Sequence, residues 1–164
     1  MRGRVFALLV ALCVGAAAAP AVEDANGQPL RLDAPPARIV SLLPSLTETV
    51  CALDACDRLV GVDRYSNWPE PVRRLPQVGG GLDPNIEAVV ALKPDLVLIG
   101  ESSRAAVRLR ALGLAVLALE PRTLADQRRG TLQLGELLQL PEAPALLARI
   151  DEALAAATAS VPPA

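Results

Sequence analysis

The chain has 164 residues, of which 52% are hydrophobic and 21% are charged, and its formal net charge is −2. This length suits one globular domain. The near balance of 16 basic and 18 acidic residues excludes a nucleic-acid binder that depends on a basic surface. The sequence contains no histidine, which excludes Ser-His-Asp and Cys-His catalysis and every metal site built on histidine.

The first 21 residues have the pattern of a secretory signal peptide. Two arginines precede an apolar run over residues 5–14, and the small residues that follow predict cleavage before Val22. The apolar run is too short to span a bilayer. Leu12 stands before Cys13 where a lipoprotein signal has a small residue, so we expect no lipid anchor there. The mature chain is therefore expected to be free in an exported compartment.

A hairpin and then an alternation of strands and helices are predicted for the first two thirds of the mature chain. Asn26-Gly27 favours a hairpin turn within residues 22–32. The predicted strands that follow are 39–43, 59–62, 95–100 and 115–119, and the predicted helices are 46–53, 84–92 and 103–112. Apolar strands that alternate with helices indicate a parallel sheet covered on both faces. We therefore expect an α/β fold with a parallel four-stranded sheet flanked by helices.

Two cysteines remain after the predicted cleavage, Cys51 and Cys56. They lie five residues apart, and in an oxidising compartment they are expected to form a local disulfide. The alternative is a pair of small buried thiols at a helix end. Two cysteines without histidine do not make a metal site.

No strand is predicted after residue 121, where two helices follow. Thr123 is suited to cap a helix that runs to about Leu140. Two prolines interrupt the pattern, and a last helix over residues 145–159 carries apolar side chains on one face. A long helix after a complete strand and helix unit suggests a connector to a further part of a protein.

Binding chemistry is expected at the carboxyl ends of the strands, because ligands of open parallel sheets bind there. The predicted ends are residues 44–45, 63–68, 100–103 and 120–122. Tyr65 and Trp68, the only aromatic residues of the mature chain, share one of these loops, which suggests a surface for a flat or bulky ligand. The alternative for Trp68 is that it packs on nearby prolines and fixes the loop.

A run of three glycines, residues 79–81, does not match a phosphate-binding loop. No strand leads into the run, and no Lys-Ser or Lys-Thr pair follows. A tight turn that brings the backbone close to a neighbour or a ligand suits these glycines better. After them, Asp83 is expected to cap a helix with Pro84 in its first turn. Glu87 then lies on that first turn. On its own, this position indicates a solvent-exposed carboxylate that interacts favourably with the helix dipole.

Three segments together carry a family resemblance: RIVSLLPSLTE at residues 38–48, LVGVDRYSNWP at 59–69 and NIEAVVALKPDLV at 85–97. They resemble the amino-terminal lobe of an ABC-transporter substrate-binding protein of the helical-backbone type, and the cobalamin-binding branch most of all. The resemblance implies two α/β lobes joined by one long helix. It divides this chain into a signal peptide (1–21), an amino-terminal lobe (22–140) and the start of the connecting helix (141–164), with the second lobe absent. A fragment, a truncated gene product and a single-lobe derivative are all open at this point.

The resemblance also implies roles for individual residues. Tyr65 matches a pocket tyrosine, Gly81 stands where the cobalamin receptor has a tryptophan, and Glu87 matches a glutamate that docks on the transporter permease. The residues expected to bind the ligand are Pro44, Ser45, Tyr65, Trp68, Gly80 and Gly81.

The function implied is the capture of a corrinoid in the periplasm and its delivery to an ABC importer, without enzymatic activity, resident cofactor or nucleic acid. A haem or ferric-siderophore receptor, in which Tyr65 ligates iron, is an alternative within the family. A remnant that binds nothing and an enzyme on a doubly wound sheet are the alternatives from other classes. The sequence does not support the enzyme alternative, because it has no nucleophile elbow and no dinucleotide glycine pattern.

Overall fold

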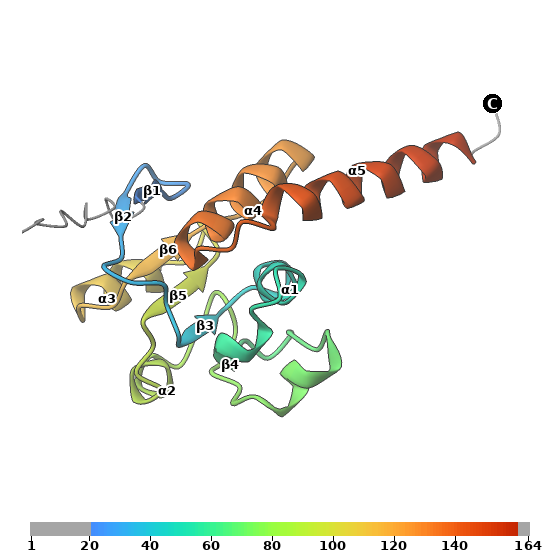
Figure 1. The fold of residues 1–164 in the computed structure, drawn as a ribbon. Coiled ribbons are helices and arrows are strands. Elements are labelled where there is room, and N and C mark those ends of the chain that lie inside the picture. Colours follow the sequence, from blue (N-terminus) through green and yellow to red (C-terminus); the bar gives the residue numbers. More distant parts are fainter. Residues whose placement is uncertain (1–20, 161–164) are drawn as a thin grey trace, which may run out of the picture.

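The computed structural model describes residues 21–160 and shows an α/β fold around one parallel sheet (Figure 1). Residues 1–20, with most of the predicted signal peptide and Cys13, lie outside the described residues. The sheet has four strands in the order β4-β3-β5-β6, all parallel. The strands are β3 (Ile39–Ser41), β4 (Leu59–Val62), β5 (Leu96–Ile99) and β6 (Val116–Ala118). The predicted fold class is confirmed.

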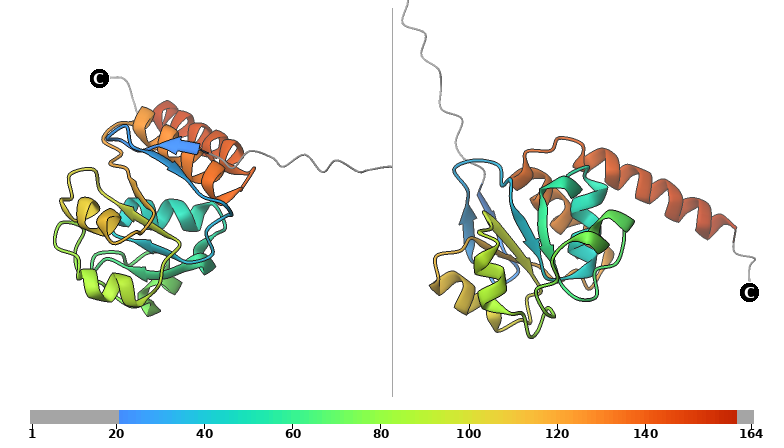
Figure 2. Two further views of the ribbon diagram at one scale, coloured as in Figure 1. Left: turned by 90° about the vertical axis from the view of Figure 1, so that its left-hand side faces the viewer. Right: turned by 90° about the horizontal axis from the view of Figure 1, so that it is seen from below.

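Helices cover both faces of the sheet, because successive side chains of a strand point to opposite faces. In β5, Leu96 and Leu98 pack toward α1 (Pro44–Ala52) and α4 (Leu124–Leu138). Val97 and Ile99 pack on the other side, toward α2 (Ile86–Ala91) and α3 (Ala105–Ala111). All four of these strand residues are fully buried. This explains why the strands are apolar without alternation. The two views of Figure 2 show the helices on either side of the sheet.

The predicted amino-terminal hairpin is present, and an ion pair connects it to helix α3. It consists of β1 (Ala21–Glu23) and β2 (Pro29–Arg31), with Gly27 in its turn at a φ of +70°. Asp24 at the turn is buried and pairs with Arg110 of α3. The carboxylate of Asp24 also accepts hydrogen bonds from the backbone N–H groups of residues 26 and 28, at 2.8 and 2.9 Å.

The short helix α2 begins later than predicted and has a different cap. The side chain of Asn85 accepts a hydrogen bond of 2.9 Å from the backbone N–H of Ala88, so Asn85 is the cap and Pro84 precedes the helix. Asp83, the predicted cap, instead forms an ion pair of 3.0 Å with Arg64. The prediction of an Asp83 cap is therefore wrong. Both side chains suit the position, and the pairing of Asp83 with Arg64 accounts for the choice.

The two carboxyl-terminal helices are joined by a tight connection. Thr123 caps α4, as predicted, in a capping box with Asp126. The second helix, α5 (Ala143–Ala159), begins two residues earlier than predicted, because Pro144 fits in a first turn and does not interrupt the helix. A side chain at Gly135 would meet the Cβ of Ala143 at 2.5 Å, so glycine is required where the helices meet.

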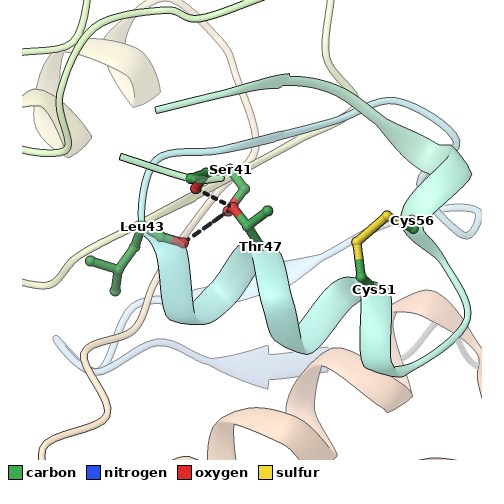
Figure 3. Close-up of a disulfide and its surroundings, with 6 residues drawn as sticks. Ser41, Leu43, Thr47, Cys51 and Cys56 are labelled. Carbon is green, nitrogen blue, oxygen red and sulfur yellow. Dashed lines mark hydrogen bonds between the residues drawn. A yellow bond between two sulfur atoms is a disulfide. The ribbon is translucent and has the colours of Figure 1, made fainter. Parts of the chain in front are cut away.

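Two 3-10 helices lie in the loops, η1 (Cys56–Arg58) and η2 (Glu70–Arg74). Cys51 at the end of α1 and Cys56 in η1 form a disulfide (Figure 3). Within residues 21–160 no helix has the length and apolar character to cross a membrane.

Candidate ligand-binding site

A cavity of about 240 Å³ opens at the carboxyl ends of the sheet strands. Its walls come from the segments that directly follow β3, β4, β5 and β6, together with the loop before α2. The lining residues are Leu42, Leu43, Pro44, Asp63, Tyr65, Gly81, Leu82, Asp83, Gly100, Ser102, Ser103 and Glu120. The location is the one expected for a ligand of an open parallel sheet. We call this space the strand-end cavity.

A chain of hydroxyl groups positions the loop that carries Tyr65. The carboxylate of Asp63, which is 1% exposed, accepts the backbone N–H of Tyr65 at 3.0 Å and the hydroxyl of Ser66. The hydroxyl of Thr47 lies 2.9 Å from that of Ser66 and donates to the hydroxyl of Ser41 at 2.8 Å. Figure 3 shows Thr47 on α1 between Ser41 and the carbonyl of Leu43. Because these groups are buried, the loop is held firmly against α1.

Tyr65 stands at the mouth of the strand-end cavity with 64% of its surface exposed. The guanidinium of Arg64 lies 5.9 Å from the centre of the Tyr65 ring and also pairs with Asp83. A cation at this distance interacts with the ring face. The ring is therefore oriented but uncovered, and it offers apolar area to a ligand.

The glycine run brings backbone close to backbone at the rim of the cavity. A Cβ on Gly81 would lie 2.5 Å from the carbonyl oxygen of Leu42, and the hydroxyl of Ser103 donates to the carbonyl of Gly81 at 2.6 Å. Gly79 has a φ of +98°, where glycine is favoured. No side chain fits at position 81, so the cavity wall there is backbone.

Glu120 follows β6 and supplies a carboxylate to the cavity. The carboxylate accepts a hydrogen bond of 3.0 Å from the backbone N–H of Ser102. Arg122 lies 3.8 Å from Glu120 and 3.9 Å from Glu101, so one guanidinium is shared by two carboxylates. The backbone N–H of Ser102, then its side chain, lower the pKa of Glu120 below its ordinary value, and Arg122 adds to the effect. Glu120 is therefore ionised at neutral pH.

The cavity brings together three of the predicted ligand-binding residues, namely Pro44, Tyr65 and Gly81. The other three, Ser45, Trp68 and Gly80, are not among its lining residues; Trp68 is 63% exposed on the same loop as Tyr65. The other lining residues were not predicted individually; those that follow the last two strands are Gly100, Ser102, Ser103 and Glu120. The sequence feature that could have identified these four residues is their position directly after two predicted strands.

A larger hollow of about 530 Å³ lies between the hairpin, α1 and α4. Its walls are largely charged or amide side chains, and it contains none of the predicted ligand-binding residues. It meets the strand-end cavity at Glu120, which lines both. The strand ends and the aromatic loop converge on the smaller cavity, which we therefore take as the candidate site.

Comparison with known proteins places the chain in a family. A family profile described as periplasmic binding protein matches residues 39–164. The chain belongs to the periplasmic binding protein family. It is 39% identical over 103 residues to the uncharacterized ABC transporter substrate-binding lipoprotein YvrC of Bacillus subtilis (strain 168), covering 60% of this chain and 32% of that protein. It is also 39% identical over 87 residues to the vitamin B12-binding protein of Yersinia pestis (strain Pestoides F), covering 51% of this chain and 31% of the relative.

Solved structures with the same fold include receptors for two ligands. The vitamin B12 binding protein BtuF of Vibrio cholerae matches 72% of this chain and 49% of its own, with a TM-score of 0.60 and 28% identity. The haem binding protein HutB of Vibrio cholerae matches 77% of this chain and 51% of its own, with a TM-score of 0.70 and 26% identity. The chain spans about a third of the length of the curated relatives and about half of these structures.

These matches confirm the resemblance to ABC-transporter substrate-binding proteins. The relatives are binding proteins and not enzymes, which also confirms the prediction of a non-enzymatic chain. Vitamin B12 and haem are in their names as the molecules that they bind, which agrees with a ligand and not a resident cofactor. Within residues 21–160, no three His, Cys, Asp or Glu side chains gather into a group that could hold a metal ion.

Proposed function

We propose that this protein captures a corrinoid in the periplasm and delivers it to an ABC importer. The observation that carries the proposal is the strand-end cavity with the uncovered ring of Tyr65 at its mouth. Ligand sites are mostly apolar with a few placed polar groups, and this cavity combines Leu42, Leu82 and the tyrosine ring with backbone and carboxylate groups. The similarity to vitamin B12-binding proteins of Yersinia and Vibrio supports the corrinoid as the ligand.

A cavity of about 240 Å³ holds only part of a macrocycle, since sites for drug-sized ligands alone occupy about 300–1,000 Å³. In keeping with this, and with the share of the related structures that the chain covers, we propose that residues 22–140 form one lobe. Helix α5, within residues 141–164, would then begin the connection that leads toward a second lobe. The ligand would lie between the two, with the strand-end cavity receiving one edge. Ser45, Trp68 and Gly80, which border the cavity in sequence, are proposed to contact the parts of the ligand that remain outside it.

Haem is the second candidate ligand, because several structural relatives are named as haem-binding proteins. The exposed Tyr65 hydroxyl is the group that would ligate iron. Titration of the full-length protein, with the proposed second lobe present, with cyanocobalamin and with haemin distinguishes the two ligands by their absorption spectra. Saturable binding of cyanocobalamin with a stronger affinity than haemin supports the proposal, and the reverse order favours the haem receptor.

In a full-length version of the protein, Tyr65→Ala is expected to weaken corrinoid binding by about 1–3 kcal/mol, because the ring contact at the cavity mouth is lost. Isothermal titration calorimetry with cyanocobalamin measures this loss. Tyr65→Phe is the matched control, since it keeps the ring and removes only the hydroxyl, and it should bind the corrinoid nearly as well as the wild type. An unchanged affinity of Tyr65→Ala would contradict the assignment. If the ligand is haem, Tyr65→Phe should itself abolish a tyrosinate-to-iron absorption band.

Glu87 is proposed to dock on the transporter permease. It lies exposed on the first turn of α2 and is not among the residues that line the cavity. Glu87→Ala should leave the affinity for the corrinoid intact and reduce ligand uptake by cells, because an interfacial ion pair is lost while the site is untouched. Glu136→Ala, which removes an exposed glutamate of α4, is the matched control. Normal uptake with Glu87→Ala would refute this docking role.

A further inference from the structure

The charged side chains that line the strand-end cavity are all carboxylates: Asp63, Asp83 and Glu120. No lysine or arginine is among its lining residues in the described part of the chain. The polar groups that accompany them are the hydroxyls of Tyr65, Ser102 and Ser103 and the exposed backbone. A ligand that enters this cavity therefore meets negative charge and hydrogen-bond acceptors.

Two of the three carboxylates are already used by the protein. Asp63 is buried and accepts two hydrogen bonds from its own loop. Asp83 pairs with Arg64 at 3.0 Å. Neither carboxylate is therefore fully available to accept a hydrogen bond from a ligand.

Glu120 differs from Asp63 because it is accessible, and from Asp83 because no cation among residues 21–160 lies within hydrogen-bond distance of its carboxylate. Its side chain is 30% exposed, and its one hydrogen bond shorter than 3.5 Å from the described residues is the backbone N–H of Ser102. The nearest cation, Arg122, is 66% exposed, lies 3.8 Å away and is shared with Glu101. The two glutamates and one arginine together carry a net charge of −1. The lowered pKa of Glu120 agrees with a carboxylate that stays ionised.

We propose that Glu120 determines ligand specificity by accepting a hydrogen bond from a carboxamide on the ligand rim and by repelling a carboxylate at the same place. This inference rests on the proposed function, since it concerns the same cavity. The edge of a corrin ring carries primary carboxamides, which donate hydrogen bonds and are neutral. Haem carries two propionate carboxylates, which would face Glu120 as like charges in a partly desolvated site. The cavity wall therefore favours a macrocycle that carries carboxamides over one that carries carboxylates.

The test uses ligand pairs that differ only in carboxylate charge, by one charge for the corrinoids and by two for haem. Cyanocobalamin is compared with its monocarboxylic acids, in which one carboxamide is replaced by a carboxylate, and haemin is compared with its dimethyl ester. A hydrogen bond to a charged group contributes about 1.5–3 kcal/mol, so cyanocobalamin should bind about tenfold or more tightly than an acid whose altered group faces Glu120. The dimethyl ester of haemin donates no hydrogen bond, and should bind more tightly than haemin only because the like-charge repulsion is removed. At least one of the cyanocobalamin acids should show this penalty in the wild-type protein.

Glu120→Gln, which keeps the size of the side chain, should reduce the preference for the neutral ligand to near unity. Glu120→Lys should reverse it. Glu136→Gln, an exposed glutamate on α4 outside the cavity, is the matched control and should keep the wild-type preference. Circular dichroism of each variant shows whether it is folded.

The outcomes separate this inference from the proposed function. Binding of corrinoids with the same preference in the wild type and in both Glu120 variants overturns the role of Glu120 and leaves the proposed function standing. Binding of haemin alone overturns the corrinoid proposal, while the haemin and dimethyl ester pair still tests Glu120. If no macrocycle binds to the protein when the proposed second lobe is also present, both are overturned.

Discussion

Replacing Asp24 with alanine should lower the free energy of unfolding by about 3 kcal/mol, because breaking a buried ion pair leaves the other charge without its partner. The Asp24 side chain has no exposed surface, whereas Arg110 keeps 29%, which places the loss at the lower end of the usual range. The same change removes the acceptor of two backbone N–H groups in the hairpin turn. Urea unfolding at constant pH, followed by circular dichroism, measures the difference.

The matched control is Asp33→Ala, which removes an exposed aspartate from the linker after the hairpin and should change stability by less than about 0.5 kcal/mol. A double-mutant cycle with Arg110→Ala isolates the pair. If Asp24→Ala and Asp33→Ala unfold at the same urea concentration, the hairpin does not stabilise the fold. The reason to expect otherwise is that the hairpin also contacts β6 and α4, through hydrogen bonds from Ala25 to Ala118 and from Gln133 to Glu23.

Gly81→Ala should cost about 1–3 kcal/mol of stability, as overpacking a close-fitting site does. The new Cβ would lie 2.5 Å from the backbone carbonyl of Leu42, which no rotamer change relieves. Because Gly81 and Leu42 both line the strand-end cavity, a shift of this backbone should also weaken corrinoid binding. Thermal unfolding and calorimetric titration measure the two effects.

Gly130→Ala is the control for a glycine without such a contact. Gly130 lies within α4, and its Cβ would meet Leu119 at an ordinary distance of 3.5 Å. Alanine is favoured over glycine in a helix by about 1 kcal/mol, so this variant should be as stable as the wild type or more so. Full stability and affinity in Gly81→Ala would show that the backbone around the cavity yields easily, against the geometry described.

The sheet was predictable from the sequence because its strands are apolar at every position except Ser41 in β3. Strand β5 has four fully buried residues between Asp95 and Gly100, a pattern that occurs when both faces of a parallel sheet are covered. The cap of α2 was not predictable in this way. Asp83 and Asn85 are both good capping residues, and the outcome depends on Arg64, which lies nineteen residues from Asp83 and attracts its carboxylate.

The candidate site was predictable only in part, for a similar reason. Tyr65 is conspicuous because aromatic residues are so rare in this chain, and Gly81 because it belongs to a glycine run. Glu120 is marked in the sequence only by its place after the last predicted strand. Its role in the cavity comes from contacts with Ser102, eighteen residues earlier, and Ser103 reaches Gly81 across twenty-two residues. Such contacts depend on the order of the strands in the sheet, which periodicity does not specify.

The junction between α4 and α5 determines the direction in which α5 points. The helix is held at its start by the contact of Gly135 with Ala143 and at its middle by an ion pair between Arg128 and Asp151, while its last turns extend away from the body of the fold (Figures 1 and 2). Seventeen residues at 1.5 Å each make a rod of about 25 Å, so a tilt of about 10° at the base moves the tip by about 4 Å. The helix is thus a lever whose pivot is the glycine contact. A side chain larger than hydrogen at position 135 would therefore change the direction in which the whole rod points, and with it the placement of anything attached beyond its tip.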